Sequence, residues 1–492
     1  MPPASRRVLR DLVAGPTASR DRFIADEIAR LPLPLPEPWT REAAARLAGS
    51  SVVVACDRQL AFARALVALD GLARRIVLCP PDLAGDALPG VLDLAEADAI
   101  VSDRGWPDPH GRDVVRVEPA PATDATAPPD PSVSDPSSPD ASLSDASSPD
   151  ASLSDASSSD RPSLPSEWAL FTSGTTGGPK MVVHTLESLS GHLRGSAAPA
   201  EPPVWCTFYD VRRYGGLQIL LRALLGGGSL VLSAPGEAAG QLLARAAALG
   251  ASHFLGTPTH WRNAMMAPEA AGISPRYVRL SGEVADQAIL DRLAARYPDA
   301  ALVHAFASTE AGVAFEVTDR RAGVPAALID GGGSGEVRLR VRDGALQVRS
   351  PRVAARRLNG ASADLTDADG FIDTGDLLER RGDRFHFVGR REGIINVGGN
   401  KVHPEEIETV INRHPRVRIS LVRARTSPIT GAVVTAEVVA DAAPDGANQA
   451  ALASDVIALC RRELAAYKVP ASVRVVPSLA VAASGKLARP RA

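Results

Sequence analysis

Strand-like and helix-like segments alternate through the first hundred residues of the chain. Short apolar runs at Ser51–Ala55, Ile76–Leu78 and Ala99–Ser102 have the length and composition of buried strands. Between the first two runs, Gln59–Leu69 has the spacing of apolar residues expected of a helix. Such an alternation predicts a parallel sheet covered by helices.

A second α/β region begins at Trp168 and continues to about Val388. Its predicted helices are Leu217–Leu225, Ala238–Leu249 and Asp286–Tyr297. Its predicted strands are Trp168–Phe171, Met181–Val183, Ser229–Leu232, Tyr277–Leu280 and Leu302–Val303. Two further strand patterns, Gly335–Arg340 and Ala345–Arg349, flank Arg342–Gly344 and predict a β-hairpin.

The last hundred residues have a rhythm of their own. The predicted helices are Glu405–Arg413 and Ser454–Ala466, and the predicted strands are Arg418–Arg423, Val433–Val439 and Ala471–Val476. We therefore predict the α/β class, with a large N-terminal domain of layered sheets and helices and a small α+β C-terminal domain. The large domain is expected to comprise residues 1–119 and 166–390, and the small domain residues 391–492.

The intervening segment, residues 120–165, differs from the rest in composition. It consists mostly of Ser, Asp, Pro and Ala, with the repeat SDPSSPDASL, SDASSPDASL and SDASSSD. Because it has no aromatic residue and almost no branched apolar residue, it cannot bury enough surface to offset the entropy lost on ordering. We predict a disordered acidic insert, with a docking segment as the functional alternative.

The overall composition is that of an ordinary globular protein. The 492 residues suffice for about three domain-sized units. A hydrophobic fraction of 45% and a net charge of -3 give no reason to expect a nucleic-acid partner, and no apolar run is long enough to span a membrane. The four cysteines lie far apart and the N-terminus lacks a signal-like apolar region, which disfavours a disulfide framework or a zinc site and favours a cytoplasmic location.

Phe171–Thr185 carries the clearest chemistry, in the sequence FTSGTTGGPKMVVHT. Its hydroxyls and glycines suit a polyphosphate, because glycine lets backbone N–H groups approach closely and Lys180 adds a positive charge. A Walker A loop would need Gly-Lys-Ser/Thr, whereas Pro179 precedes Lys180 and Met181 follows it. A flexible Ser/Thr/Gly linker, the other alternative, fits poorly between two strand-like segments.

Four further motifs follow in order along the chain. They are Phe306–Glu310 (FASTE), Phe371–Asp376 (FIDTGD), Val388–Glu408 (VGRREGIINVGGNKVHPEEIE) and Ser484–Arg489 (SGKLAR). With the glycine-rich segment they resemble the core motifs of the adenylate-forming superfamily, which includes acyl-CoA synthetases, aryl-CoA ligases, luciferases and peptide-synthetase adenylation domains. The resemblance covers about residues 168–489, and the occurrence of all five motifs in this order makes it specific.

The resemblance implies a site for ATP. The residues expected at the β- and γ-phosphates are Thr172, Ser173, Gly174, Thr175, Thr176 and Lys180. Those expected around adenine are Phe306, which would stack on the base, and the segment formed by Ser281, Gly282 and Glu283. The chain has Phe306 and Ala307 where the family more usually has Tyr and Gly.

The remaining nucleotide contacts also follow from the resemblance. Thr309 would bond the α-phosphate, and Glu310 would hold Mg²⁺, a role that suits a hard oxygen ligand. Asp376 and Arg390 would contact the ribose.

The implied reaction has two steps. A small carboxylic acid reacts with ATP to give an acyl-adenylate and pyrophosphate, with Lys486 as the catalytic lysine beside Thr309 and Glu310. The small, mobile domain then turns about a hinge at Glu392, where the family usually has Asp or Lys. Its Gly398, Gly399 and Lys401 would then line a channel for a thiol.

Coenzyme A is the expected acceptor, and a stand-alone enzyme that loads the phosphopantetheine of a carrier protein is the alternative. A non-catalytic nucleotide-binding protein is the alternative of another class. Such a protein would have no physical reason to keep Lys180, Glu310, Asp376, Arg390 and Lys486 together.

The segments Trp205–Leu225 and Phe254–Trp261 are expected to shape the acyl pocket, lined by Tyr209, Arg212, Tyr214 and Gly215. Relatives that activate amino acids place an aspartate here, but Asp210 falls about four residues too early when counted from the strand Leu230–Leu232, so a simple carboxylic acid is favoured. Arg212 and Arg213 could pair a second acidic group on the substrate. Adjacent arginines are, however, more often solvated or paired with protein carboxylates.

Overall fold

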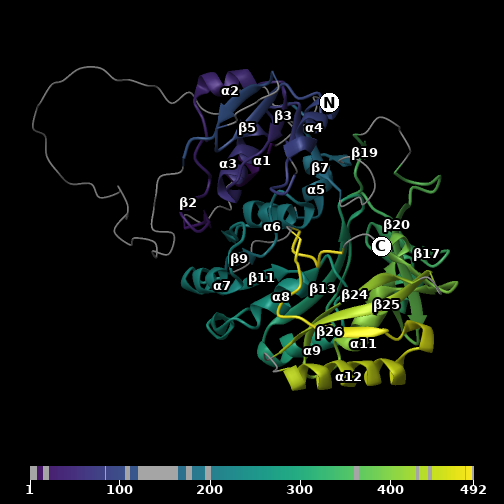
Figure 1. Ribbon diagram of the computed structural model, residues 1–492. Helices are drawn as coiled ribbons and strands as arrows, with labels where there is room; N and C mark the ends of the chain where they lie inside the picture. The colour runs from purple at the N-terminus through teal and green to yellow at the C-terminus, as the bar shows by residue number, and fades with distance from the viewer. Residues whose placement is uncertain are drawn as a thin grey trace, which may run out of the picture.

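The computed structural model describes residues 8–14, 21–83, 85–105, 111–119, 164–172, 180–193, 201–358, 365–427, 431–441, 446–482 and 484–489. Three large sheets with their helices form one body, and a smaller unit at the C-terminal end packs beside it (Figure 1). The predicted insert, residues 120–165, lies outside the described residues except for Leu164 and Pro165.

The first sheet has seven strands in the order β19-β8-β7-β4-β3-β5-β6. Its strands are β3 (Ser51–Val54), β4 (Arg75–Leu78), β5 (Ala99–Ser102), β6 (Asp113–Arg116), β7 (Glu167–Phe171), β8 (Met181–His184) and β19 (Arg356–Arg357). The helices that pack on it are α1 (Leu9–Val13), α2 (Arg41–Leu47), α3 (Gln59–Leu69) and α4 (Leu88–Leu94). Strands β3 to β7 pair in parallel, as the alternating pattern predicts, and β8 and β19 close one edge in antiparallel pairing.

The second sheet has eight strands in the order β14-β13-β12-β11-β9-β10-β1-β2. Its strands are β1 (Phe23–Ala25), β2 (Arg30–Pro32), β9 (Val204–Thr207), β10 (Ser229–Leu232), β11 (His253–Gly256), β12 (Tyr277–Ser281), β13 (Ala301–Ser308) and β14 (Gly312–Val317). Its helices are α5 (Leu186–Ser190), α6 (Tyr214–Leu225), α7 (Ala239–Ala248), α8 (Pro258–Ala264) and α9 (Gln287–Arg296). The six neighbouring strands β13, β12, β11, β9, β10 and β1 pair in parallel and form the middle of this sheet.

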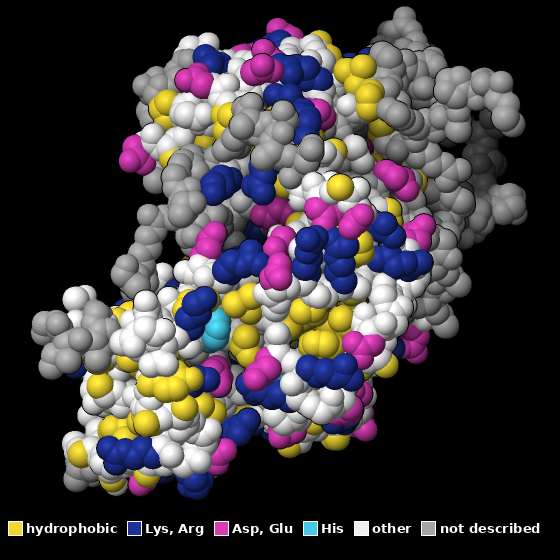
Figure 2. Space-filling view, turned by 90° about the vertical axis from the view of Figure 1, so that its right-hand side faces the viewer, with side chains coloured by type: hydrophobic (Ala, Val, Ile, Leu, Met, Phe, Trp, Pro, Cys, Tyr) yellow, Lys and Arg dark blue, Asp and Glu magenta, His cyan; other side chains and the backbone are white. Residues whose placement is uncertain are grey.

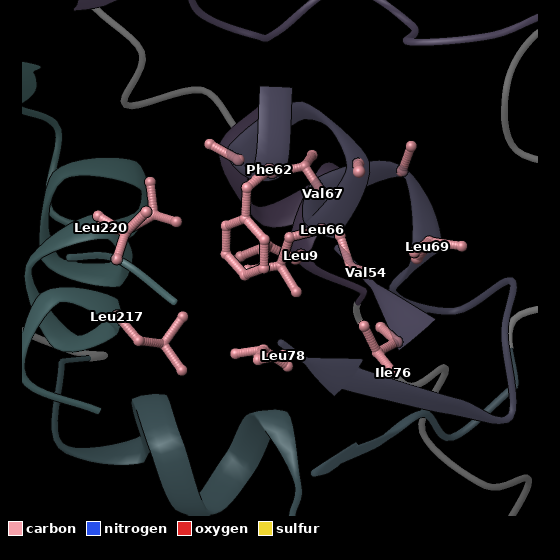
Figure 3. Packing of buried hydrophobic residues seen from close by; sticks show 14 of the residues in the cluster. Leu9, Val54, Phe62, Leu66, Val67, Leu69, Ile76, Leu78, Leu217 and Leu220 are labelled. Carbon is pink, nitrogen blue, oxygen red and sulfur yellow. The ribbon is translucent and has the colours of Figure 1, made fainter. Parts of the chain in front are cut away.

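Helix α6 lies between these two sheets. Leu230 of β10 packs in the same core as α6, whereas the next residue, Val231, packs with α7, α8 and α9 on the opposite face, as the alternation of side chains along a strand requires. Figure 3 shows Leu217 and Leu220 of α6 pointing toward Phe62 of α3. One apolar core therefore joins the two sheets and holds α6 in a fixed position.

The third sheet is antiparallel, with six strands in the order β15-β21-β20-β18-β17-β16. Its elements are β15 (Val324–Pro325), α10 (Ala326–Asp330), β16 (Gly333–Ser334), β17 (Val337–Arg342), β18 (Ala345–Arg349), β20 (Ile372–Arg381) and β21 (Arg384–Arg390). The predicted hairpin is confirmed: Asp343 and Gly344, both with positive φ, turn β17 into β18. The half-buried Arg340 of β17 pairs with Asp367. On the face of the molecule seen in Figure 2, positive and negative side chains are interleaved.

The small C-terminal unit is built from a hairpin, a three-stranded sheet and two helices. Its elements are β22 (Ile395–Val397), β23 (Asn400–Val402), α11 (Pro404–Ile411), β24 (Val417–Ser427), β25 (Gly431–Ala440), α12 (Gly446–Glu463) and β26 (Ser472–Val475). Helix α12 begins before the predicted Ser454 and ends before the predicted Ala466. Alanine-rich sequence favours helix without an amphipathic pattern, which explains the early start.

Contacts between helices of the large domain and the small unit fix their relative placement. Arg262 of α8 donates from Nη1 to the Arg418 carbonyl oxygen at 3.0 Å. Asn412, after α11, donates to the Oδ2 atom of Asp286 at 3.1 Å, and the same carboxylate pairs with Arg262. Within the part of the chain described above, no helix combines the length and apolar character needed to cross a membrane.

Candidate active site

The turn between β13 and β14 carries Thr309 and Glu310. His184, the last residue of β8, holds this turn, because its Nε2 atom lies 2.7 Å from the Thr309 carbonyl oxygen. A carbonyl oxygen only accepts, so Nε2 carries the proton and Nδ1 faces the Ser188 hydroxyl at 3.1 Å. Burial lowers the pKa of His184 to about 4, so the ring is neutral at neutral pH.

Sequence reasoning missed this histidine, although it stands inside the quoted segment Phe171–Thr185. Its position at the end of an apolar strand that leaves the glycine-rich loop is the signal that could have identified it.

Phe306 belongs to a stack of three phenylalanines from two sheets. Its ring centroid lies 5.7 Å from that of Phe315 on β14 and 5.3 Å from that of Phe387 on β21, with interplanar angles of 18° and 12°. Phe306 and Phe387 are both partly exposed. The stack thus offers aromatic surface of the kind that suits a purine.

Asp376 and Arg390 are brought together by the register of the third sheet. They are direct partners across β20 and β21, and Arg390 Nε donates to Asp376 Oδ1 at 3.0 Å. Burial lowers the pKa of Arg390, but the carboxylates of Asp376 and, more weakly, Glu310 outweigh it and raise the pKa above its ordinary value. The structure therefore places the predicted ribose pair close to the predicted metal ligand.

The C-terminal segment, yellow in Figure 1, runs from the small unit back to the large domain. Thr257 Oγ1 donates to the Gly485 carbonyl oxygen at 2.7 Å, and the Leu487 amide donates to Glu283 Oε1 at 3.0 Å. Between these two anchors, the Lys486 Cε atom lies 3.3 Å from the position that a β-carbon on Gly282 would occupy. Lys486 thus lies beside the Ser281–Glu283 segment.

The charges around Lys486 come from several elements. Burial lowers its pKa, and the positive charges of Arg390 and Arg213 act in the same direction, whereas Glu283 and Asp376 oppose the shift. Lys486 therefore shares one electrostatic environment with the Asp376–Arg390 pair.

Thr257, Thr259 and Glu283 form the anchor for this segment. Glu283 accepts from the Thr259 amide and hydroxyl, each at 3.0 Å, as well as from the Leu487 amide. Sequence reasoning gave Glu283 a place beside adenine and placed the two threonines only within the acyl-pocket segment Phe254–Trp261, without a role of their own. The residues Thr257-Pro-Thr at the start of α8 are a helix-start signal that could have drawn attention to them.

The predicted phosphate loop is described only at its ends. Ser173, Gly174, Thr175 and Thr176 lie outside the described residues. The Thr172 amide donates to the Lys180 carbonyl oxygen at 2.9 Å, so both ends of the loop meet where β7 pairs with β8.

Three of the predicted acyl-pocket residues lie together near this site. The Tyr209 hydroxyl donates to the Ser281 carbonyl oxygen at 2.9 Å, and a β-carbon on Gly215 would touch the Tyr209 ring at 3.7 Å. The buried Tyr214 ring at the start of α6 lies 6.0 Å from the His184 ring. These three residues thus lie near one another and near the Thr309 turn.

The structure corrects the expectation for Arg212. This side chain is only 1% exposed, and its guanidinium donates to both carboxylate oxygens of Asp210 and to the carbonyl oxygens of Cys56 and Asp57. Because its donors are already engaged by the protein, Arg212 does not line a pocket. Both carboxylate oxygens of Asp210 likewise accept hydrogen bonds from Arg212. Pairing with a protein carboxylate, the alternative weighed above, is what the structure shows.

The predicted hinge and thiol-channel residues lie on the surface of the small unit. Glu392 is in a short 3-10 turn, Arg391–Gly393, directly after β21. Gly398 and Gly399, with φ of 56° and 88°, form the exposed turn between β22 and β23, and Lys401 is exposed on β23. In this arrangement the Lys486 segment, and not this hairpin, lies against Gly282.

A large domain of sheets and helices, with a small domain whose lysine reaches the strand ends of the large one, is the arrangement of the adenylate-forming class of enzymes. The chain belongs to the AMP-binding enzyme family: the family model of that description matches residues 45–354, and the model for the AMP-binding enzyme C-terminal domain matches residues 406–486. The predicted family resemblance is therefore confirmed.

Curated relatives and solved structures agree with this assignment. The 2-succinylbenzoate–CoA ligase of Listeria monocytogenes serotype 4b is 28% identical over 355 residues, which are 67% of this chain and 72% of the relative. The feruloyl-CoA synthase of an Amycolatopsis species is 29% identical over 342 residues, or 65% of this chain and 67% of the relative.

Among solved structures, the anthranilate CoA ligase AuaEII with anthranoyl-AMP has a TM-score of 0.74 at 16% identity, covering 98% of this chain and 95% of its own. The o-succinylbenzoate CoA synthetase of Bacillus subtilis with its acyl-adenylate has a TM-score of 0.68 at 18% identity, covering 97% and 96%. These likenesses confirm the predicted α/β fold with a large and a small domain.

Proposed function

We propose that the chain is an AMP-forming acid–thiol ligase that activates a small carboxylic acid with ATP and passes the acyl group to coenzyme A. The observation that carries this proposal is the position of Lys486, delivered by the small domain to a point beside Gly282 and the Asp376–Arg390 pair. Membership of the AMP-binding enzyme family and the CoA ligases among its curated relatives support it.

In the first step a carboxylate oxygen of the acid attacks the α-phosphorus of ATP. The bond from that phosphorus to the bridging oxygen breaks, and pyrophosphate leaves with the electron pair. Negative charge is shared between the attacking and leaving oxygens, so a fixed cation nearby stabilises the transition state more than the separated reactants. Lys486 is the cation that we assign to this role.

The other predicted residues hold the nucleotide for this attack. Phe306 stacks on adenine, Asp376 and Arg390 bind the ribose, and Thr309 binds the α-phosphate. The hydrogen bond from His184 to the Thr309 carbonyl fixes the turn that carries Thr309 and Glu310. The β- and γ-phosphates are assigned to Thr172, Ser173, Gly174, Thr175, Thr176 and Lys180. Holding the acid and the phosphate in line supplies a large part of the catalysis, without a nucleophile on the protein.

Glu310 is the residue that would hold Mg²⁺. Its carboxylate is a hard oxygen ligand and is partly exposed at the turn after β13. The negative charge of Glu310 also helps to raise the pKa of Arg390. When bound, the ion would neutralise charge on the phosphates. A B. subtilis relative of similar fold has been solved with ATP and magnesium ion.

In the second step the thiol sulfur attacks the acyl carbon of the adenylate, AMP leaves, and the thiol proton is released. For this step we propose that the small domain turns at Glu392, withdraws Lys486 and brings Gly398, Gly399 and Lys401 to the acceptor. Coenzyme A is the proposed acceptor because the curated relatives are named as CoA ligases.

Two lysine variants test both steps by a crossed comparison. Lys486→Ala should lower ATP–pyrophosphate exchange by at least about 100-fold, the usual effect of removing one transition-state charge partner. It should leave thioester formation from preformed acyl-adenylate and CoA largely intact. Lys401→Ala should show the reverse pattern, and Lys486→Arg controls for charge. Equal loss of both half-reactions in Lys486→Ala would contradict the assigned role.

The acid is found with an exchange panel of aliphatic, aromatic, hydroxy, dicarboxylic and amino acids. Absence of exchange with every member, in protein that binds ATP, would favour a non-catalytic nucleotide-binding role instead.

A further inference from the structure

One face of α6 carries polar side chains that the proposed mechanism does not use. Tyr214, Gln218 and Arg222 recur at every fourth position of the helix, so they lie on one side of it. Leu217 and Leu220 lie on another side and pack toward the first sheet (Figure 3). We call the three residues the polar stripe of α6.

Two members of the stripe have a buried polar atom without a partner among the described residues. These atoms are Gln218 Oε1 and the Tyr214 hydroxyl oxygen, which lies near the Val313 backbone without a hydrogen bond of regular geometry. Tyr214 is 6% exposed and Gln218 is 4% exposed, so solvent does not satisfy them. Gln218 Nε2 donates to the Leu189 carbonyl oxygen at 3.1 Å, which sets the orientation of the amide. Unpaired buried groups are rare in native proteins, and a polar ligand that pairs with them is one explanation for their presence.

The stripe is surrounded by more positive than negative charge. Burial raises the pKa of the Tyr214 hydroxyl, and the charges of Arg352, Arg279 and Arg222 act against that shift, which places three guanidinium groups around it. Glu316 of β14 pairs with Arg279, and its Oε1 atom lies 3.7 Å from Arg222. Glu316 thus contacts two of the three arginines, so among the charged groups named here positive charge exceeds negative charge.

Of these arginines, Arg222 has the most donors to offer. Arg352 Nη1 donates to the Val313 carbonyl oxygen at 2.8 Å, and Arg279 is engaged by Glu316. The single ion pair of Arg222 within the described chain is the 3.7 Å contact to Glu316, and its side chain is 24% exposed. The neighbouring His184 ring brings no charge, because burial lowers its pKa to about 4.

The stripe begins at the reacting end of the site and leads away from it. A β-carbon on Gly312, just after the Thr309–Glu310 turn, would lie 3.3 Å from the Tyr214 hydroxyl. Arg222 lies two helical turns beyond Tyr214, about 12 Å along the axis. An acid with its reacting carboxylate at the turn would thus extend along α6 toward Arg222.

We propose that the polar stripe of α6 binds a second acidic group of the substrate, so that the preferred acid of this enzyme is a dicarboxylic acid with several bonds between its two carboxyl groups. This inference rests on the proposed function, because it names the substrate class of the same site. Arg222 supplies the charge and paired donors, Tyr214 supplies a hydroxyl donor, and Gln218 Oε1, one turn from Arg222, accepts from its guanidinium and orients it.

The test compares matched acids in the wild-type enzyme by ATP–pyrophosphate exchange. The pairs are pentanoate with glutarate, heptanoate with pimelate, and benzoate with phthalate. For at least one pair, kcat/KM should be at least about tenfold higher for the diacid, equivalent to about 1.4 kcal/mol. Arg222→Gln and Tyr214→Phe should each lower the diacid-to-monoacid ratio, Arg222→Gln by about tenfold or more. Arg276→Gln removes the same charge from an exposed position just before β12 and should leave the ratio unchanged.

The outcomes separate this inference from the proposed function. Equal kcat/KM for diacids and monoacids in the wild type overturns the subsite and leaves the ligase intact, and equal kcat/KM for a diacid and its monoamide overturns the requirement for charge. No exchange with any acid contradicts the ligase. In that case calorimetric titration of pimelate and heptanoate, with AMP present, decides the subsite: tenfold tighter binding of pimelate that Arg222→Gln abolishes supports it, and equal binding overturns it. If Arg222→Gln does not fold, the wild-type ratios decide.

Discussion

Replacing Gly485 by alanine should remove Lys486 from its place without altering the lysine itself. Gly485 has a φ of 73°, a conformation that residues with a β-carbon rarely adopt. A β-carbon there would lie 1.8 Å from His260 Cε1, whereas carbon atoms in contact are usually about 3.5–4.0 Å apart. Either the C-terminal segment or the His260 ring must therefore move.

His260 is held in place by several contacts. Its ring stacks on Phe208 with 5.5 Å between centroids, and its Nδ1 atom accepts from the Thr257 amide at 3.1 Å. Losing the hydrogen bond costs about 1 kcal/mol. Losing the ring pair costs about 0.5–1.5 kcal/mol. The positive φ of an alanine adds roughly 1 kcal/mol. The total of about 3 kcal/mol corresponds to about a hundredfold smaller population with Lys486 in place.

The assay measures the two half-reactions separately. Gly485→Ala should lower ATP–pyrophosphate exchange by about a hundredfold, by the population argument above. It should change thioester formation from preformed acyl-adenylate by no more than about twofold, because we propose that Lys486 is withdrawn in that step. Adding His260→Ala should recover about 30-fold, since only the backbone term of roughly 1 kcal/mol then remains. Gly485→Ala with unchanged exchange, or with equal loss in both steps, would refute the reasoning.

Three further predictions concern charge, packing and the insert. Burial and Arg390 lower the pKa of Lys486, so the exchange rate should decline with rising pH before the pH of about 10.4 at which a free lysine loses its proton. Lys486→Arg should move this decline to higher pH. A profile of exchange rate against pH that does not move would contradict this prediction. Arg262→Met should lower the free energy of unfolding by about 3–5 kcal/mol, because it leaves the buried Asp286 carboxylate without its cation. Arg292→Met should lower it by less than about 1 kcal/mol, because the ion pair of Arg292 with Asp441 is exposed. Urea unfolding of both variants measures the difference. Deletion of Ser132–Ser159 should leave exchange and Tm unchanged, since its composition cannot support packing, and a large loss in either would show that the segment is structural.

The elements that the sequence predicted best are those buried on every side. Helix α3 has the predicted bounds, and β3, β4 and β5 agree within a residue, because each is an apolar run bounded by polar or glycine residues. The predicted start of helix α12 was wrong, because the first turns of this helix depend on the helix propensity of alanine and not on a repeating apolar face. The strand order could not be read from such patterns, since β4 lies between β3 and β7 through contacts across the long insert.

For the site, the motifs identified residues that would meet a ligand but not those that position them. The residue types of a Thr-Glu turn or of a lysine near the C-terminus are enough to indicate their chemistry. The hydrogen bonds by which His184 and Thr257 hold these segments depend on which strand end lies beside which turn, and residue type does not show this. Arg212 shows the opposite error, because a loop that folds Asp210 back onto it converts a candidate ligand into an internal ion pair.

The Asp376–Arg390 pair shows why three-dimensional register decides the outcome. The two residues are direct partners across β20 and β21, and the pairing includes an irregularity at Leu377 and Leu378. A slip of one residue would turn Arg390 to the opposite face of the sheet, away from Asp376 and Glu310. The motif spacing allows either register. The ribose contact assigned to this pair therefore depends on the irregularity in β20 as much as on the two side chains, and a deletion at Leu377 should weaken ATP binding even though it removes no predicted ligand.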